Sequence, residues 1–460
     1  MLPKPQLDPA SEIPLYRQLY DFIRGSIDDG TLPLGSRLPA TRELAGQLGL
    51  NRTTVSAAYE LLETEGLIRG HVGRGSFVSA RSAVEPGISF AASRPSAGLF
   101  PLDEFRETCQ EVLAGPEAAA ILQLGAPNGY GPLREYLLEA ARSAGEAAPG
   151  DDILITSGCQ QALDLVRRAL IGAGDSVAVE DPVYPGLRMA FQQGGTRLLG
   201  IPVGLRGLDV DALERTLATE RPALAALTPD FQNPTGTSLD HATRNRVLCI
   251  VKSTGARLIE NDIYGDLRYE GERAPTLKAL DPGAGTILLR SFSKIAFPGL
   301  RVGWIVGPRE IVRRLAEAKR WCDLHTDQLS QAVLLRFAET GRLAAHRGRV
   351  LRAGTERLRA ALDACSRRLP AGSEFTRPEG GMHLWARLPG GIDTAEALGK
   401  AQRAGVAYLP GSYFAVTRDH SSALRLSFAG VEPEQIAKGI ALLGDVFQEE
   451  LERAPEPAMV

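Results

Sequence analysis

The first stretch of the chain has a helical pattern of hydrophobic positions. Apolar side chains recur three or four residues apart, which predicts one amphipathic helix with its buried stripe at Leu15, Leu19, Phe22, Ile23 and Ile27. Gly30 and Pro33 end that helix. A short helix is expected over Thr41–Leu48, followed by a tight turn at Gly49.

A third helix and two short strands follow in the same segment. Asn51 is a good N-cap because its side-chain oxygen can accept an orphan backbone N–H, so the third helix begins behind it. Extended pieces are expected at residues 67–69 and 76–78, joined by a glycine-rich turn. This order of elements predicts a winged helix-turn-helix, α-helical with a small β wing, over residues 1–80. Residues 81–86 form a linker too short to let the two parts move widely.

From Ile88 onward, short apolar runs alternate with helical stretches. The apolar runs predict buried strands at residues 153–155, 176–179, 223–227, 257–259 and 286–289. Helical patterns lie between most of them, for example over 160–171 and 239–253. This βαβ rhythm predicts an α/β domain whose parallel sheet has helices on both faces.

The last part of the chain mixes long helices with strands such as residues 382–385. We expect residues 87–354, with an N-terminal arm, to form the large α/β domain and residues 355–460 a smaller α+β domain. The protein is therefore expected to be multidomain, in line with a length of 460 residues.

Composition limits the classes of function. Lys plus Arg is 52 and Asp plus Glu is 55, a net charge of -3, so DNA binding must come from a local face. No apolar run approaches the roughly 18 residues that span a bilayer. The N-terminus has no apolar signal-peptide core. The five cysteines have neither metal-ligand nor disulfide spacing, so we expect no metal site and a reduced, cytoplasmic setting.

Spaced motifs at residues 37–45, 48–55, 65–68 and 73–78 resemble the winged-helix DNA-binding domain of the GntR family over nearly all of residues 12–80. A recognition helix presents its first turn to base edges, and Arg52 in that turn is the best candidate for reading guanine. Arg42 would reach phosphate, and the wing tip would enter the minor groove or grip phosphate. The candidate DNA-binding residues are Arg37, Arg42, Asn51, Arg52, Thr53, Thr54, His71 and Arg74.

A lysine between hydroxyl groups indicates covalent chemistry. Ser291-Phe292-Ser293-Lys294 precedes Arg301, and a lysine amine can form a Schiff base with an aldehyde cofactor whose phosphate the serines and arginine hold. Asp262 follows a buried strand, 294 − 262 = 32 residues before the lysine. A carboxylate at such a position can keep a pyridine nitrogen protonated, which makes the ring an electron sink.

Three further segments fit the same cofactor. Asn233, in the run Gln232–Gly236, can donate a hydrogen bond to the phenolic oxygen of the ring. Residues 156–163 stand between a strand and a helix, so the helix N-terminus suits phosphate. Tyr184 offers an aromatic face for stacking on the ring.

This set of motifs resembles the fold type I pyridoxal-phosphate enzymes of the class I/II aminotransferases across roughly residues 88–450. The resemblance implies pyridoxal 5'-phosphate as cofactor, with Lys294 forming the internal aldimine and Asp262 pairing with the pyridine nitrogen. Asn233 and Tyr264 would contact the phenolic oxygen, and Tyr184 would stack on the ring. The implied phosphate-binding residues are Gly158, Cys159, Gln160, Ser291, Ser293 and Arg301.

The resemblance also implies a ligand site. Arg425, in the run Leu424–Phe428, would clamp the α-carboxylate of a substrate beside Asn233. The chain departs from the family at Leu124, where a tyrosine is usual, and at Cys159, which replaces a hydroxyl residue.

The order of the two parts resembles the MocR subfamily of GntR regulators over nearly the whole chain. The resemblance implies a homodimeric transcription regulator that binds a double-stranded DNA operator and senses an amino acid or amine by aldimine chemistry at Lys294. The alternative is an active aminotransferase of the aminoadipate or kynurenine type with an attached or vestigial DNA-binding domain. A third hypothesis is a pyridoxal-phosphate protein of other chemistry, such as a lyase. Whether the chain is an enzyme stays open.

Overall fold

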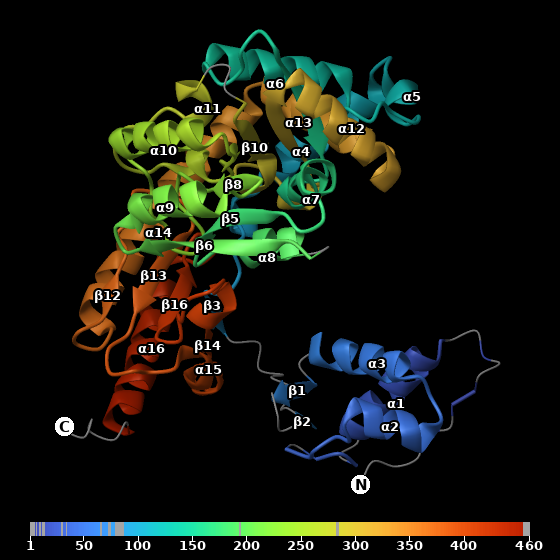
Figure 1. Cartoon of the computed structure of the whole chain (residues 1–460), viewed down its shortest axis with the longest axis vertical. Coiled ribbons are helices and arrows are strands. Elements are labelled where there is room, and N and C mark those ends of the chain that lie inside the picture. Colours follow the sequence, from blue (N-terminus) through green and yellow to red (C-terminus); the bar gives the residue numbers. More distant parts are fainter. Residues whose placement is uncertain are drawn as a thin grey trace. The chain divides into compact units, whose positions relative to one another are not determined.

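A computed structural model describes the chain over residues 5, 7–8, 11, 14–28, 31–33, 35–64, 67–71, 75–78, 87–192, 195–281 and 285–453. The chain divides into two compact units, Met1–Glu85 and Pro86–Val460 (Figure 1). The predicted linker at residues 81–86 lies outside the described residues. In the stretches that the structure describes, no helix is both long enough and apolar enough to cross a membrane.

The smaller unit is the predicted winged helix. Its elements are α1 (Leu15–Asp28), α2 (Thr41–Leu48), α3 (Arg52–Thr64), β1 (Ile68–His71) and β2 (Gly75–Val78). Helices α1 and α2 pack on α3 because their apolar stripes meet in one core that includes Leu19, Leu44 and Val55. Strands β1 and β2 form an antiparallel wing, to which Arg37 adds a bridge opposite Phe77.

The larger unit is built on an eight-stranded sheet in the order β4-β11-β10-β9-β8-β5-β6-β7. The strands are β4 (Asp151–Thr156), β5 (Ser176–Asp181), β6 (Arg197–Gly204), β7 (Gly207–Leu208), β8 (Leu224–Leu227), β9 (Arg257–Asn261), β10 (Ile287–Ser291) and β11 (Gly303–Pro308). The prediction of a parallel sheet is confirmed for β10, β9, β8, β5 and β6. It is wrong for β11, which runs antiparallel to both β10 and β4, and for β7, which runs antiparallel to β6.

Helices cover both faces of this sheet (Figure 1). They are α4 (Leu102–Ala114), α5 (Ala118–Ile121), α6 (Gly131–Ser143), α7 (Cys159–Leu170), α8 (Pro185–Gln192), α9 (Val210–Glu220), α10 (His241–Thr254), α11 (Leu277–Leu280), α12 (Arg309–Asp323) and α13 (Gln328–Glu339). Successive residues of a strand face opposite sides. In β9, Ile259 therefore packs in the core of α7, α8 and α12, whereas Leu258 packs in the core of α9 and α10.

Short 3₁₀ turns connect several of these elements and carry residues of the site described below. They are η1 (Ala97–Leu99), η2 (Gly265–Leu267), η3 (Phe292–Lys294) and η4 (Pro298–Leu300). Because η3 follows β10 directly, the lysine motif lies at the carboxyl end of a buried strand.

The C-terminal part forms the expected smaller α+β layer, with a four-stranded antiparallel sheet in the order β12-β13-β16-β15. Its elements are α14 (Arg342–Arg368), β12 (Glu374–Phe375), β13 (His383–Arg387), α15 (Thr394–Arg403), β14 (Val406–Ala407), β15 (Leu409–Pro410), η5 (Gly411–Phe414), β16 (Ala423–Ser427) and α16 (Pro433–Arg453). Strand β3 (Ile88–Ser89) pairs with β14. Helix α14 runs through the expected boundary at residues 354 and 355, so one continuous helix belongs to both parts.

Candidate functional site

A cavity of about 170 Å³ lies at the carboxyl ends of β9 and β10, beside the N-terminus of α7. This is the edge of an open α/β sheet at which ligands bind. The structure brings nine of the predicted site residues together around it, namely Cys159, Gln160, Tyr184, Asn233, Tyr264, Ser291, Ser293, Lys294 and Arg301. These residues come from segments far apart in the sequence, so the fold assembles them.

One end of the cavity has the donors that an oxyanion needs. Gly158 (φ 82°) turns the chain into α7, and a Cβ at this position would lie 2.4 Å from Nη2 of Arg301. The glycine therefore leaves room for the guanidinium beside the first turn of α7. Ser291 and Ser293 both line the cavity, and the Ser291 hydroxyl donates a hydrogen bond to the Ser293 hydroxyl at 2.9 Å. Helix N–H groups, hydroxyls and a guanidinium are together the kind of donors that can bind a phosphate.

The Lys294 amine lies in the same cavity as these donors. Its Nζ donates a hydrogen bond to the backbone oxygen of Ser93 at 2.7 Å. Burial, with the positive charge of Arg425, lowers the pKa of the Lys294 amine from 10.5 to about 8. An amine with such a pKa is partly neutral near physiological pH, and the neutral form is the nucleophile.

Arg425 is a buried cation next to the cavity. It is 3% exposed, and its Nη1 donates to Oδ1 of Asn233 at 3.0 Å while Nη2 donates to the backbone oxygen of Ala91 at 2.5 Å. Its Nε has no partner, and among the described residues no carboxylate pairs with it. Burial lowers the pKa of the Arg425 guanidinium to about 10, so the group stays charged at neutral pH. A buried charge without a counter-ion favours binding of an anion.

The side chain of Asn233 links this cation to a buried phenol. Its Nδ2 donates to the hydroxyl of Tyr264 at 3.1 Å, and Nε2 of His383 lies 3.3 Å from the same hydroxyl. Burial raises the pKa of Tyr264 and lowers the pKa of His383 well below its usual value. The phenol and the imidazole are therefore both neutral at physiological pH, which suits hydrogen bonding without added charge.

The structure does not place Asp262 in the cavity. Its Oδ2 accepts hydrogen bonds from Arg273 and Arg290, both at 2.6 Å, and its Oδ1 accepts one from the backbone N–H of Gly265 at 3.1 Å. Although burial raises the pKa of this carboxyl, the two guanidiniums outweigh burial and hold the pKa below its usual value. The expected role of Asp262 as the partner of a ring nitrogen therefore does not fit its position.

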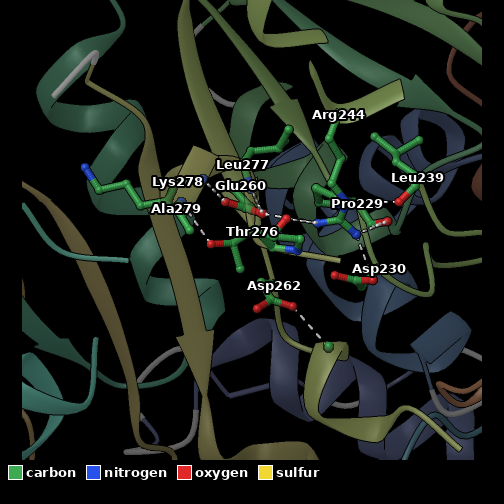
Figure 2. Close-up of polar contacts among 12 residues, drawn as sticks. Pro229, Asp230, Leu239, Arg244, Glu260, Asp262, Thr276, Leu277, Lys278 and Ala279 are labelled. Carbon is green, nitrogen blue, oxygen red and sulfur yellow. Dashed lines mark hydrogen bonds and ion pairs between the residues drawn. The ribbon is translucent and has the colours of Figure 1, made fainter. Parts of the chain in front are cut away.

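Asn261 lines the cavity wall, where the sequence predicts Asp262. Alternation along β9 explains the difference, because Asn261 shares a face with Ile259 and α7. Glu260 belongs to the other face, where its two carboxylate oxygens accept the backbone N–H groups of Leu277 and Lys278 (Figure 2). The sequence prediction named Asp262 because a carboxylate can pair with a ring nitrogen, whereas the structure has Asn261 on the cavity wall.

Sequence reasoning missed other groups around the cavity. Ser93 has no motif, because it acts through its backbone oxygen in the loop after β3. His383 has no motif either, yet its Nε2 also lies 3.2 Å from the Ser93 hydroxyl. Arg290 forms an ion pair with Asp262. The sequence could have indicated this pair only through the position of Arg290 directly before the Ser291 motif.

The winged helix presents the predicted DNA-binding side chains. Arg37, Arg42, Asn51, Arg52 and Thr53 are exposed, and Thr54 is half-buried. Oδ1 of Asn51 accepts the backbone N–H of Thr53 at 3.1 Å, which confirms the predicted N-cap. An open groove along α3 is lined by Arg52, Thr53, Ser56, Ala57 and Glu60. The side chain of His71 and all of Arg74 lie outside the described residues.

Comparisons with known proteins divide the chain in the same way as the fold. Residues 91–443 match the family "Aminotransferase class I and II". Residues 15–78 match the family "Bacterial regulatory proteins, gntR family". Both halves of the sequence-based interpretation are thus found at the expected places.

Individual relatives fall into two groups. The HTH-type transcriptional regulator YdfD of Bacillus subtilis is 30% identical over 97% of this chain and 98% of its own length. The probable rhizopine catabolism regulatory protein MocR of Rhizobium meliloti is 29% identical over 96% of this chain and 95% of its own. The crystal structure of the α-aminoadipate aminotransferase LysN from Thermus thermophilus, complexed with N-(5'-phosphopyridoxyl)-L-leucine, has a TM-score of 0.74 and 37% identity and covers 80% of this chain and 93% of its own.

Proposed function

Because the chain belongs to the class I and II aminotransferase family and carries a GntR-family regulatory domain at its N-terminus, we propose that it is a transcription regulator whose DNA binding responds to an amino acid or amine. The observation that carries the ligand class is Arg425, a buried cation with an unpartnered Nε beside the cavity. The full-length similarity to the regulators YdfD and MocR supports the regulatory role over a purely metabolic one.

The cofactor is pyridoxal 5'-phosphate. When bound, it supplies an aldehyde that condenses reversibly with primary amines and a ring that can accept electrons. The phosphate-binding end at α7 fits it because Gly158 leaves the space that Arg301 occupies. We assign Ser291, Ser293, Arg301 and the first turn of α7, from Cys159 and Gln160, to the phosphate.

The remaining contacts of the cofactor follow from the same arrangement. Lys294 is the attachment residue, because its amine lies in the cavity and is partly neutral near physiological pH. Asn233 and Tyr264 would contact the phenolic oxygen, and the aromatic ring of Tyr184 would stack on the cofactor ring. With Arg425 hydrogen-bonded to Asn233, a ligand carboxylate would bind next to the ring.

The rate at which apo-protein takes up pyridoxal phosphate should rise with pH. Protonated Lys294 is unreactive, and its pKa of about 8 means that the reactive neutral amine gains population as pH rises through about 8 and then saturates. Arg425→Gln removes a positive charge that lowers this pKa, so the midpoint should move upward. Stopped-flow absorbance of the cofactor, recorded against pH, measures the midpoint in the natural protein and in the variant. A midpoint near the ordinary lysine value of 10.5 in the natural protein would contradict Lys294 as the reacting amine.

The variant Arg425→Gln should weaken amino acid binding by about 10- to 100-fold, the loss expected for hydrogen bonds to a charged group. Cofactor uptake should persist, because Arg425 does not line the cofactor cavity. A decarboxylated amine of the same side chain is the matched control ligand, and it should bind both proteins alike. Equal loss for the amine and the amino acid, measured by titration of cofactor absorbance, would remove Arg425 from carboxylate recognition.

We propose that the regulator acts as a homodimer on a double-stranded operator. Large apolar side chains are exposed on the larger unit, including Leu122, Leu124 and, at 82% exposed, Trp321. Exposed apolar side chains of this size can be buried in an interface between subunits. Two recognition helices would then meet two half-sites, and binding to chromosomal DNA would place the protein in the cytoplasm. Light scattering of the purified protein at micromolar concentration tests the dimer.

The second candidate is an active aminotransferase. It is favoured by the 37% identity to LysN and by the nine assembled cavity residues. The two candidates differ in one product, because an aminotransferase releases a 2-oxoacid at each turnover and a sensor does not. Quantifying released 2-oxoacid while measuring operator affinity in the same sample separates them.

A further inference from the structure

The wall of the cofactor cavity carries no carboxylate among the described residues that line it. Asp262 lies between two residues that line the cavity, Asn261 and Ile263, but does not line it itself. Both of its carboxylate oxygens already accept hydrogen bonds, from Arg273, Arg290 and Gly265. Turning it into the cavity would break its ion pairs with Arg273 and with the mostly buried Arg290, whose side chain is 14% exposed, and this is unfavourable. The cofactor ring therefore meets no negative charge from this strand.

Asn261 is the polar group at the end of β9 that does point into the cavity. The residue is 3% exposed, and its Nδ2 donates a long hydrogen bond of 3.3 Å to Oγ1 of Thr228. Its Oδ1 is buried and has no partner among the described residues. A buried amide oxygen without a partner is costly, so this side chain is expected to pair with a bound molecule.

The other polar groups of the cavity are already assigned. Ser291, Ser293, Arg301 and the start of α7 form the phosphate end, Asn233 and Tyr264 face the phenolic oxygen, and Lys294 attaches the cofactor. The ring nitrogen is the one polar atom of pyridoxal phosphate that these groups leave unpaired. Among the described residues that line the cavity, Asn261 is the one side-chain amide to which no part of the cofactor has been assigned.

We propose that the side-chain amide of Asn261 faces the ring nitrogen of the cofactor and that this nitrogen is unprotonated in the resting protein. The proposal rests on pyridoxal phosphate binding as part of the proposed function. A half-turn of the amide exchanges Oδ1 and Nδ2, so Nδ2–H donates to an unprotonated nitrogen while Oδ1 accepts from Thr228.

The charge of the partner decides how well the ring accepts electrons. A carboxylate favours a protonated ring nitrogen by direct attraction, and an opposite charge nearby shifts a pKa by about 1–3 units. A neutral amide supplies no such attraction, so Asn261 leaves the ring a weak electron acceptor. Exchange of amines at Lys294 does not need that capacity, whereas removal of a proton from the amino acid does. Asn261 thus separates reversible ligand binding from turnover, as a sensor requires.

The test uses full-length protein loaded with pyridoxal phosphate labelled with ¹⁵N in the ring. The ¹⁵N chemical shift reports directly whether the ring nitrogen carries a proton, independently of activity. In the natural protein the signal should be that of an unprotonated nitrogen at neutral pH. In Asn261→Asp it should move to the protonated position, and conversion of the cofactor by an added amino acid should become about 10- to 1,000-fold faster.

The matched control is the neighbouring exchange, Asp262→Asn. This variant removes a carboxylate of the same size from the same strand end and should leave the ¹⁵N signal unprotonated. A protonated signal in the natural protein would overturn the proposal, and this measurement needs no variant to fold. A folded, loaded Asn261→Asp protein with an unchanged signal would overturn it as well. Neither result bears on DNA binding, so failure here is distinguishable from failure of the regulator hypothesis.

Discussion

Lys294→Ala should leave a folded protein that no longer attaches pyridoxal phosphate covalently. The side chain supplies the one lysine amine that lines the described cavity, and its lowered pKa depends on that burial. Borohydride treatment should fix the cofactor to the natural chain and should fix none to the variant. The proposed phosphate contacts at Ser291, Ser293 and Arg301 are unchanged in this variant, so weak non-covalent binding should persist.

Lys252→Ala is the matched control for this loss. Lys252 is exposed in the last turn of α10 and should not affect cofactor attachment. Mass spectrometry of the borohydride-treated proteins identifies the modified peptide. Cofactor fixed to another lysine in the Lys294→Ala protein would show that the attachment site is wrong.

Arg52→Ala should reduce specific operator binding to the non-specific level while leaving the cofactor spectrum intact. Arg52 is exposed at the start of α3 and lines the groove along that helix. Loss of a bidentate contact to guanine costs about 1–3 kcal/mol of discrimination per recognition helix, and a dimer has two such helices. Fluorescence anisotropy with a mapped operator and a scrambled duplex measures the ratio of the two affinities.

Arg42→Ala provides a contrasting variant for the same assay. Arg42 is exposed on α2, where a cation reaches phosphate rather than bases. Its loss should weaken binding to operator and scrambled DNA alike and reduce the salt dependence. If Arg52→Ala instead weakens both duplexes equally, Arg52 contacts the backbone and the specificity lies elsewhere.

Local patterns predicted the elements of the smaller unit well. The helix expected over Thr41–Leu48 has those bounds in the structure, because its limits depend on the adjacent turn at Gly49 and on local apolar spacing. The larger sheet was predicted less completely. The direction of β11 depends on where the chain re-enters the sheet after η4, and no periodicity in the strand encodes that.

The candidate site divides in the same way. Lys294, Ser291, Ser293, Arg301, Asn233 and Tyr264 were predicted from motifs whose residue types the chemistry requires, and the structure brings them to one cavity. The choice between Asn261 and Asp262 depended on the register of β9. A shift of one residue moves a side chain to the other face of a strand, so chemical preference alone could not decide it. Arg273 and Arg290, which pair with Asp262, come from other segments of the chain. Their ion pairs hold the Asp262 carboxylate away from the cavity.

The most direct test of the central claim measures DNA affinity and 2-oxoacid release in one sample. Full-length, cofactor-loaded protein is titrated onto its operator with and without each of a panel of amino acids, and released 2-oxoacid is quantified. A ligand acts only through its different affinity for the two DNA-binding states, so we expect one amino acid to change operator affinity by about 5- to 150-fold. The 2-oxoacid should not accumulate beyond one equivalent per subunit. Steady 2-oxoacid release with unchanged operator affinity would contradict the regulator and establish an aminotransferase in its place.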